Sequence, residues 1–243
     1  IGGIWFDGEW DQFKWDGKRF GEPMADFKLA EVYSLIHKLQ PQALIGSNHH
    51  LAPNPGEDFQ MFEKDLPGRS TKSFATSADD IGKLPLEVCE TINGSWGFNL
   101  KDRKHKSKKD LVQYLIKAAG YNSNLLLNVG PMPNGKIQKE HIKSLKEIGE
   151  WIKINGETIY GTTRGPIDPT DEIASTQKAN TIYIHLLDNR KTYFIEGYNP
   201  KIKNISYYHS NKKVEYQKTK SGLIINVDDN ELDEIDTIIE LEI

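Results

Sequence analysis

The sequence predicts an α/β protein in which the later half of a (β/α)8-type barrel precedes an antiparallel β-sandwich domain. In residues 1–164, apolar strand-like runs alternate with helical patterns, as in a parallel sheet with helices outside it. From residue 165 to residue 243, short runs of alternating apolar and polar residues replace that pattern. Such alternation is typical of antiparallel strands with one buried face. We therefore expect two domains, 1–164 and 165–243.

The first domain is expected to contain four strands separated by helices. The strands are Ile1–Phe6, Ala43–Asn48, Leu86–Ile92 and Asn124–Val129, and the helices are Glu22–Leu39, Leu111–Ala119 and His141–Ile154. The helices carry apolar residues at three- and four-residue spacing. Residues 48–74 are predicted to form a long loop. A closed barrel needs eight strands and about 250 residues, so an upstream segment of the same barrel is expected as a partner.

The second domain is expected to be built from short antiparallel strands. They are Thr181–Leu187, Thr192–Gly197, Ile202–Tyr208, Gly222–Val227 and Thr237–Ile243. In the last run, apolar residues at 239, 241 and 243 alternate with Glu240 and Glu242, which predicts one buried and one solvated face.

Composition and charge exclude several classes of function. The 243 residues are 37% hydrophobic and 27% charged, with a net charge of -4, which describes an ordinary globular protein without a basic field for nucleic acid. No apolar run reaches the roughly 18 residues of a membrane span, so we expect neither nucleic acid nor membrane as a partner. Cys89, the single cysteine, excludes an internal disulfide and a multi-cysteine metal site.

The segment Ile4–Trp10 brings an apolar run to a stop at a carboxylate between aromatic residues. In a β/α barrel the functional groups lie at the carboxyl ends of the strands, so Asp7 would be the first group beyond the core. Trp5 and Trp10 could then provide flat apolar walls for a sugar. A buried strand followed by a turn at Asp7-Gly8 explains the same residues without any function.

Hydrolysis of a glycosidic bond with retention needs two carboxyl groups about 5 Å apart, one that attacks the anomeric carbon and one that protonates the leaving oxygen. Asp7 is our candidate nucleophile. The loop segment Gly56–Lys64, which contains Glu57 and Glu63, is the expected source of the second carboxyl group.

Five motifs together resemble the α-L-fucosidases of glycoside hydrolase family 29, and they occur in the family's order. They are Ile-Trp-Phe-Asp-Gly-Glu-Trp at 4–10, the loop ending in Glu63, Ser-Trp-Gly-Phe at 95–98, the strand 124–131 with Asn134-Gly135, and the segment from Gly149-Glu150-Trp151 to Ile159-Tyr160. The motifs span roughly two thirds of the chain, and their co-occurrence is far more specific than any one of them.

The resemblance implies a retaining, exo-acting fucosidase with a barrel followed by a β-sandwich, using no metal and no organic cofactor. Its partner would be a fucosylated glycan or glycoconjugate, and its location periplasmic or secreted. Asp7 matches the family's nucleophile, which forms a covalent fucosyl-aspartate, and Trp5 matches a tryptophan that borders the fucose site.

The family resemblance also suggests the remaining site residues. The family's usual Pro-Glu reads Phe62-Glu63 here, and we predict Glu63 as the acid/base, with Glu87 and Glu57 as alternatives. His50 stands near the place where relatives often carry an arginine that reaches the sugar.

Trp96 is predicted to border the C6 methyl group of fucose, although a core aromatic explains it equally. Two other functions stay open: a non-catalytic carbohydrate-binding remnant of a fucosidase, and a retaining glycosidase acting on another sugar. The fucosyl linkage is not fixed by these residues.

Overall fold

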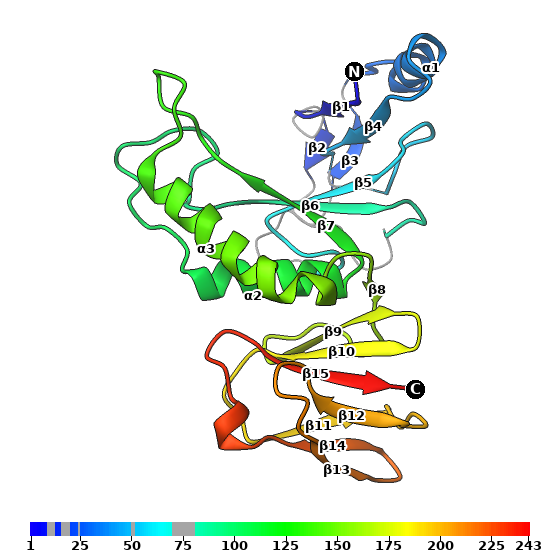
Figure 1. Cartoon of the computed structure of the whole chain (residues 1–243). Coiled ribbons are helices and arrows are strands. Elements are labelled where there is room, and N and C mark those ends of the chain that lie inside the picture. The colour runs from blue at the N-terminus through cyan, green and yellow to red at the C-terminus, as the bar shows by residue number, and fades with distance from the viewer. Residues whose placement is uncertain (9–12, 16–19, 24, 50–51, 70–80) are drawn as a thin grey trace. The chain divides into compact units, whose positions relative to one another are not determined.

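The computed structural model describes residues 1–8, 13–15, 20–23, 25–49, 52–69 and 81–243. The chain divides into two compact units (Figure 1). The first unit comprises Ile1–Glu90 and Ser123–Leu127, and the second comprises Thr91–Asn122 and Asn128–Ile243.

The first unit is organised around short parallel strands. The strand β1 (Gly3–Phe6) pairs in parallel with β4 (Leu44–Ser47), and β5 (Gln60–Glu63) pairs in parallel with β6 (Leu86–Thr91). The strand β7 (Ser123–Asn128) adds to β6 on the side opposite β5. Backbone amides at the start of the β5 segment donate to the carbonyl of Ile45, which places β5 beside β4.

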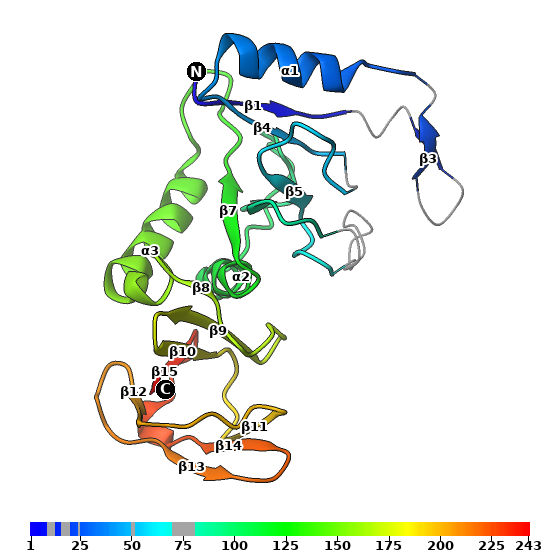
Figure 2. The same ribbon diagram turned by 90° about the vertical axis from the view of Figure 1, so that its right-hand side faces the viewer.

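The helix α1 (Leu29–Leu39) lies beside β1 in this unit (Figure 2). Its Tyr33 is buried, and the Tyr33 ring packs on Phe6 at the end of β1 with ring centroids 5.3 Å apart. The antiparallel pair β2 (Phe13–Trp15) and β3 (Phe20–Pro23) lies between β1 and α1 in the sequence.

Two expectations for the first unit were wrong in detail, and one feature was missed. The predicted loop 48–74 contains β5, whose short run Gln60–Glu63 is preceded by a segment rich in Pro, Gly and Asp that is typical of a loop. The predicted helix from Glu22 begins only at Leu29, because Glu22 and Pro23 belong to β3. The hairpin formed by β2 and β3 was not predicted at all.

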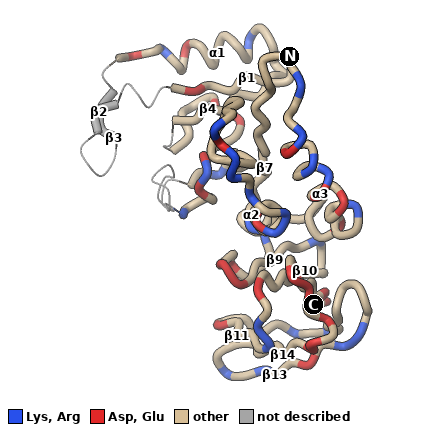
Figure 3. Tube along the Cα trace, turned by 90° about the vertical axis from the view of Figure 1, so that its left-hand side faces the viewer, with Lys and Arg blue, Asp and Glu red and all other residues tan. Residues whose placement is uncertain are grey.

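Two helices and two antiparallel sheets make up the second unit. The helix α2 (Lys108–Gly120) begins three residues before the predicted start because Ser107 caps it: the Ser107 hydroxyl accepts from the Asp110 amide, and the Asp110 carboxylate accepts from the Ser107 amide. The helix α3 (Lys139–Asn155) bears interspersed positive and negative side chains (Figure 3). This mixture is typical of a solvated helix face.

The two sheets contain eight strands in the orders β12-β15-β10-β9-β8 and β11-β14-β13. The strands that the sequence predicts are found as β10 (Thr181–Leu186), β11 (Thr192–Glu196), β12 (Asn204–Tyr207), β14 (Gly222–Asn226) and β15 (Thr237–Glu242). The strands β8 (Thr163–Arg164), β9 (Ile173–Lys178) and β13 (Glu215–Lys218) were missed. All four residues of β13 are exposed, so it carries no apolar alternation.

One hydrophobic core is shared by both sheets of the second unit. Ile184 and Ile239 come from the five-stranded sheet, Leu223 and Ile225 come from the three-stranded sheet, and all four are fully buried. Full burial of such a side chain contributes about 1.5–3 kcal/mol. This core therefore accounts for the cohesion of the two sheets.

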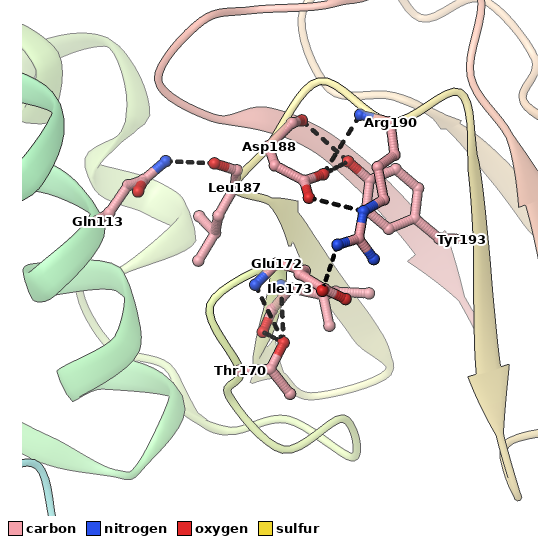
Figure 4. A network of polar contacts seen from close by, with 8 residues as sticks. All are labelled: Gln113, Thr170, Glu172, Ile173, Leu187, Asp188, Arg190 and Tyr193. Carbon is pink, nitrogen blue, oxygen red and sulfur yellow. Dashed lines mark hydrogen bonds and ion pairs between the residues drawn. The ribbon is translucent and has the colours of Figure 1, made fainter. Parts of the chain in front are cut away.

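The side chain of Gln113 in α2 bonds to segments next to the five-stranded sheet. Its Nε2 atom donates to the carbonyl oxygen of Leu187, which follows β10 (Figure 4), and to that of Ile235, which precedes β15. Glycine at position 120 lets the end of the helix approach Pro169, because a Cβ atom there would lie 2.7 Å from the Pro169 ring.

The turn between β10 and β11 is held by a surface network (Figure 4). Arg190 forms ion pairs with Glu172 and Asp188, and the Tyr193 hydroxyl donates to Asp188. Burial, followed by the hydrogen bond with Asp188, raises the pKa of the Tyr193 phenol well above its usual value. Within the described part of the chain, no helix combines the length and apolar character of a membrane span.

Candidate active site

The site is built where β1 and β4 end. The register pairs Phe6 with Ser47, and the backbone amide of Asn48 donates to the carbonyl of Phe6 over 2.9 Å. The next side chains on the two strands, those of Asp7 and Asn48, therefore emerge side by side. This is the edge at which parallel sheets of the β/α class carry their functional groups.

The amide of Asn48 connects the two carboxylates that the sequence predicts to be catalytic. Its Nδ2 atom lies 3.2 Å from Asp7 Oδ1 and 2.8 Å from Glu63 Oε2. The two oxygens are therefore at most 6.0 Å apart, the sum of these distances. Retaining glycosidases separate their carboxyl groups by about 5–5.5 Å, and inverting ones by about 6.5–9.5 Å. The structure thus brings the carboxylates of Asp7 and Glu63 together at one hydrogen-bond donor.

Glu57, an alternative acid/base in the sequence analysis, belongs to a buried network. Its Oε1 atom lies 2.8 Å from His49 Nε2 and 3.4 Å from the Tyr33 hydroxyl. The side chains of His49 and Glu57 are only 2% and 1% exposed. A carboxylate enclosed in this way has little access to a substrate, which favours a structural role.

Glu87, the other alternative, lies on β6 and is hydrogen-bonded to the side chain of Trp5. Burial raises the pKa of the Glu87 carboxyl above its usual value, and the hydrogen bond with Trp5 offsets part of that rise. A carboxyl group with a raised pKa keeps its proton to a higher pH than an exposed one, which suits a general acid. Glu87 therefore stays an alternative for the acid role, and its described contact is with Trp5.

A cavity of about 430 Å³ lies within the first unit, with Trp5 and Glu87 in its wall. Its other lining residues come mainly from the early parts of the strands, namely Gly2, Gly3, Ile4, Leu44, Asp58, Phe59, Pro85, Leu86, Asn124 and Leu126. Asp7 and Glu63 stand at the opposite, carboxyl ends of β1 and β5 and do not line it. The cavity is therefore distinct from the carboxylate pair, and Trp5 is the predicted sugar-binding residue that borders it.

Trp96 lies in the second unit, in a segment packed backbone to backbone against the residues that follow β7. The Trp96 carbonyl accepts from Asn128 Nδ2 over 2.7 Å, and a Cβ atom at position 130 would lie 2.5 Å from the Gly97 carbonyl carbon. The Trp96 side chain is 37% exposed. Because it lies in the other unit from Asp7, its role in binding fucose stays a prediction.

Two predicted residues, His50 and Trp10, lie outside the described residues. Cys89 is buried. Burial, followed by the nearby charges of Glu63 and Glu87, raises the pKa of the Cys89 thiol to about 12, so the thiol stays protonated. In the described ranges, no group of three His, Cys, Asp or Glu side chains is arranged to hold a metal ion.

Asn48 is the site residue that the sequence analysis missed. In the sequence Asn48 is the last residue of a predicted strand, and of the polar residues that follow the strand only His50 is predicted to bind the sugar. A signal was present, because Asn48 is the polar residue that directly follows the second buried strand, as Asp7 follows the first. The register between the two strands, which makes them neighbours, is known only from the structure.

Comparison with known proteins agrees with the resemblance. The family profile described as alpha-L-fucosidase matches residues 2–157, more than half of the chain. The fold and the match place the chain in a family of glycoside hydrolases. The chain belongs to the alpha-L-fucosidase family.

Individual relatives cover the chain to different extents. The plasma alpha-L-fucosidase of Homo sapiens is 35% identical over 161 residues, which cover 55% of this chain and 34% of that protein. The structure of alpha-L-fucosidase isoenzyme 1 from Paenibacillus thiaminolyticus has 30% identity and a TM-score of 0.74, covering 100% of this chain and 57% of that one.

A third relative shows the same fold at lower identity. It is a GH29 alpha-L-fucosidase from Bacteroides thetaiotaomicron, solved as a trapped covalent intermediate, with 17% identity and a TM-score of 0.75 over 98% of this chain and 55% of that one. The chain thus spans between about a third and somewhat over half of the length of these relatives.

Proposed function

We propose that the protein containing this chain is a retaining exo-α-L-fucosidase that releases terminal α-L-fucose from a glycan or glycoconjugate. The observation that carries the proposal is the shared hydrogen-bond donor: Asp7 and Glu63 both accept from Asn48 Nδ2, so the two accepting oxygens are at most 6.0 Å apart, closer than the carboxyl groups of an inverting pair. Membership of the alpha-L-fucosidase family supports fucose as the sugar.

In the proposed mechanism Asp7 attacks the anomeric carbon of fucose while Glu63 transfers its proton to the oxygen of the leaving group. The products of this step are a fucosyl ester of Asp7 and the free aglycone. Glu63, now a carboxylate, removes a proton from water, and the resulting hydroxide displaces Asp7 from the anomeric carbon. Two inversions give net retention. The trapped covalent intermediate of the Bacteroides thetaiotaomicron relative supports this class of mechanism.

The choice of Glu63 over its rivals rests on contacts. Glu63 is the carboxylate that shares a donor with Asp7, whereas Glu57 is enclosed with His49 and Glu87 is bonded to Trp5. Glu63 also ends its strand at the same edge as Asp7 and Asn48. The acid/base must reach both water and the fucoside that Asp7 attacks, so it belongs at that edge.

Three further residues are proposed to bind the sugar. Trp5 and Trp96 are both partly exposed, and aromatic rings of this kind provide apolar surface for the faces and the methyl group of a deoxy sugar. His50 is proposed to donate a hydrogen bond to a fucose hydroxyl, in place of the arginine of relatives.

The proposed architecture is the later part of a β/α barrel followed by a β-sandwich. The parallel pairs β1–β4 and β5–β6 support the first, and the core shared by the two antiparallel sheets supports the second. We further propose that earlier strands of the same barrel cover the cavity beside Leu44 and Leu126, whose side chains are 55% and 45% exposed.

The proposal is tested by replacing Asp7 with Gly in the full-length gene product. Hydrolysis of an aryl α-L-fucoside should fall at least about 1,000-fold. Added azide should restore reaction and give a fucosyl azide of inverted configuration, because azide enters on the face that Asp7 occupied. As a matched control, Asp26→Gly removes a carboxylate that is 68% exposed and should keep normal turnover.

Two results would refute the assignment. One is near-normal hydrolysis by the Asp7→Gly variant. The other is the appearance of β-L-fucose as the first product when the unchanged protein hydrolyses the aryl α-L-fucoside. An NMR time course detects this anomer, which would mean inversion.

A further inference from the structure

We propose that Asn48 is a positioning residue that sets the distance between the nucleophile and the acid/base. This inference rests on the proposed function of Asp7 and Glu63. It assigns Asn48 no contact with substrate; its action is entirely through the two carboxylates.

The geometry of the amide supports this role. One nitrogen, Asn48 Nδ2, lies within hydrogen-bond distance of both Asp7 and Glu63, and an amide nitrogen carries two protons to donate. Ionised carboxylates only accept, so the nitrogen of the amide must face them and its oxygen must face away. The residue is 1% exposed, so water has little opportunity to replace this donor.

The backbone beneath Asn48 is fixed on both sides. Its own amide donates to the carbonyl of Phe6, the residue before Asp7. The following residue, His49, is held by Glu57, and Glu57 also accepts from Tyr33. The ring of Tyr33 in turn packs on Phe6. These contacts form a closed ring that starts and ends at Phe6. The ring leaves the Asn48 side chain few alternative positions.

The chemistry explains why a neutral donor suits this place. In the proposed mechanism the negative charge alternates between the two groups: Asp7 is ionised while Glu63 is protonated, and Glu63 is ionised while Asp7 is a fucosyl ester. A residue placed between them therefore has to stabilise a negative charge first on one carboxyl group and then on the other. A shared N–H donor is attracted to each of them and does not titrate. Asn48 can thus hold the pair at the retaining separation in every protonation state of the cycle.

The test uses Asn48→Leu, which keeps the size of the side chain and removes the donor, in the full-length gene product. Displacing a catalytic group by about 1 Å costs about 100-fold in rate. We therefore expect kcat to fall about 100-fold while KM changes little. The loss should be similar for aryl fucosides with good and poor leaving groups, because both carboxylates are displaced.

A matched control and a second variant keep the test decisive. Asn230 is exposed and its Nδ2 donates to the Asp228 carboxylate over 2.9 Å, so Asn230→Leu removes the same kind of bond away from Asp7 and should leave kcat unchanged. Asn48→Asp keeps size and polarity but places a third carboxylate between the two. It should lose activity at neutral pH and regain part of it at lower pH, with an acid-shifted optimum.

The outcomes separate this inference from the proposed function. If the unchanged protein does not hydrolyse α-L-fucosides, the proposed function fails. If it does, but Asn48→Leu keeps normal kcat, or Asn48→Asp keeps the normal rate and pH optimum, the positioning role is overturned. Should Asn48→Leu not fold, Asn48→Asp alone decides.

Discussion

His185 and Asp236 form a fully buried pair in the second unit, with Nδ1 of the imidazole 2.8 Å from Oδ2 of the carboxylate and both side chains 0% exposed. Burial raises the pKa of the Asp236 carboxyl, and the nearby charge of Asp233 raises it further. His185 and His209 lower this pKa and offset part of the rise. The pair thus introduces a titratable carboxyl group into an otherwise apolar region, which makes the stability of the unit depend on pH.

Replacing Asp236 with Asn should weaken that pH dependence. Because the pKa of Asp236 is higher in the folded protein than its ordinary 3.8, the stability linked to its protonation is present below pH 3.8 and is lost as the pH rises through the folded value. The melting temperature of the Asn variant relative to the unchanged protein should therefore increase from pH 4 to pH 8. Asp171→Asn, at a side chain that is 84% exposed, should show no such trend and serves as the control.

Glu63→Gln and Glu87→Gln should differ in their dependence on the leaving group. If Glu63 is the acid, Glu63→Gln should cleave a phenyl fucoside about 100- to 10,000-fold more slowly than the unchanged protein does. The rate of the first step should fall far less with a dinitrophenyl fucoside, because dinitrophenolate leaves without being protonated. Azide should then yield a fucosyl azide of retained configuration. Glu87→Gln should show neither behaviour. The reverse pattern would transfer the acid role to Glu87.

Replacing Trp5 with Phe should raise the pKa of Glu87 further. The hydrogen bond with Trp5 lowers this pKa, against the larger effect of burial, and phenylalanine cannot make that bond. The titration can be followed by carbon-13 NMR of labelled glutamate side chains, with the Glu87 signal identified from its absence in Glu87→Gln. A lower or unchanged pKa in the Phe variant would contradict the described contact.

Gly130→Ala should destabilise the protein by about 1–3 kcal/mol, the usual cost of overpacking. The added Cβ atom would lie 2.5 Å from the Gly97 carbonyl carbon and 2.6 Å from the Phe98 amide nitrogen, and backbone atoms cannot move aside cheaply. Gly149 offers a matched control, because it lies exposed in α3 with open space at its Cβ position. Gly149→Ala should stabilise by about 1 kcal/mol. Denaturant unfolding of both variants measures the difference.

The sequence predicted the parts of the fold that have a clear period. The strand that ends before Asp7 and the helices at 108–120 and 139–155 were recognised because their apolar spacing is regular. The strands β5 and β13 were not, since the first follows directly on a segment rich in Pro, Gly and Asp and the second is wholly exposed. Short or uniformly polar strands take their conformation from neighbouring strands, and a single sequence does not show those neighbours.

The candidate site was likewise predicted only in part from the sequence. Asp7 and Glu63 could be selected from residue type and motif, but the enclosure of Glu57 by His49 depends on how α1 and the 48–59 segment pack. The bridging position of Asn48 depends on the register between β1 and β4. Both are long-range facts of folding, which no local pattern encodes.

Glu63 is the final residue of a strand, and this limits how the protein can change over time. Since consecutive side chains of a strand point to opposite faces, a single insertion within Gln60–Glu63 would turn the carboxylate away from Asp7. The residues from Glu57 to Phe59 are also constrained, because Glu57 is bonded to His49 and the amides of Asp58 and Phe59 are bonded to Ile45. Natural variation in length should accordingly accumulate before Glu57, where new loop shapes can alter the choice of aglycone without disturbing the chemistry.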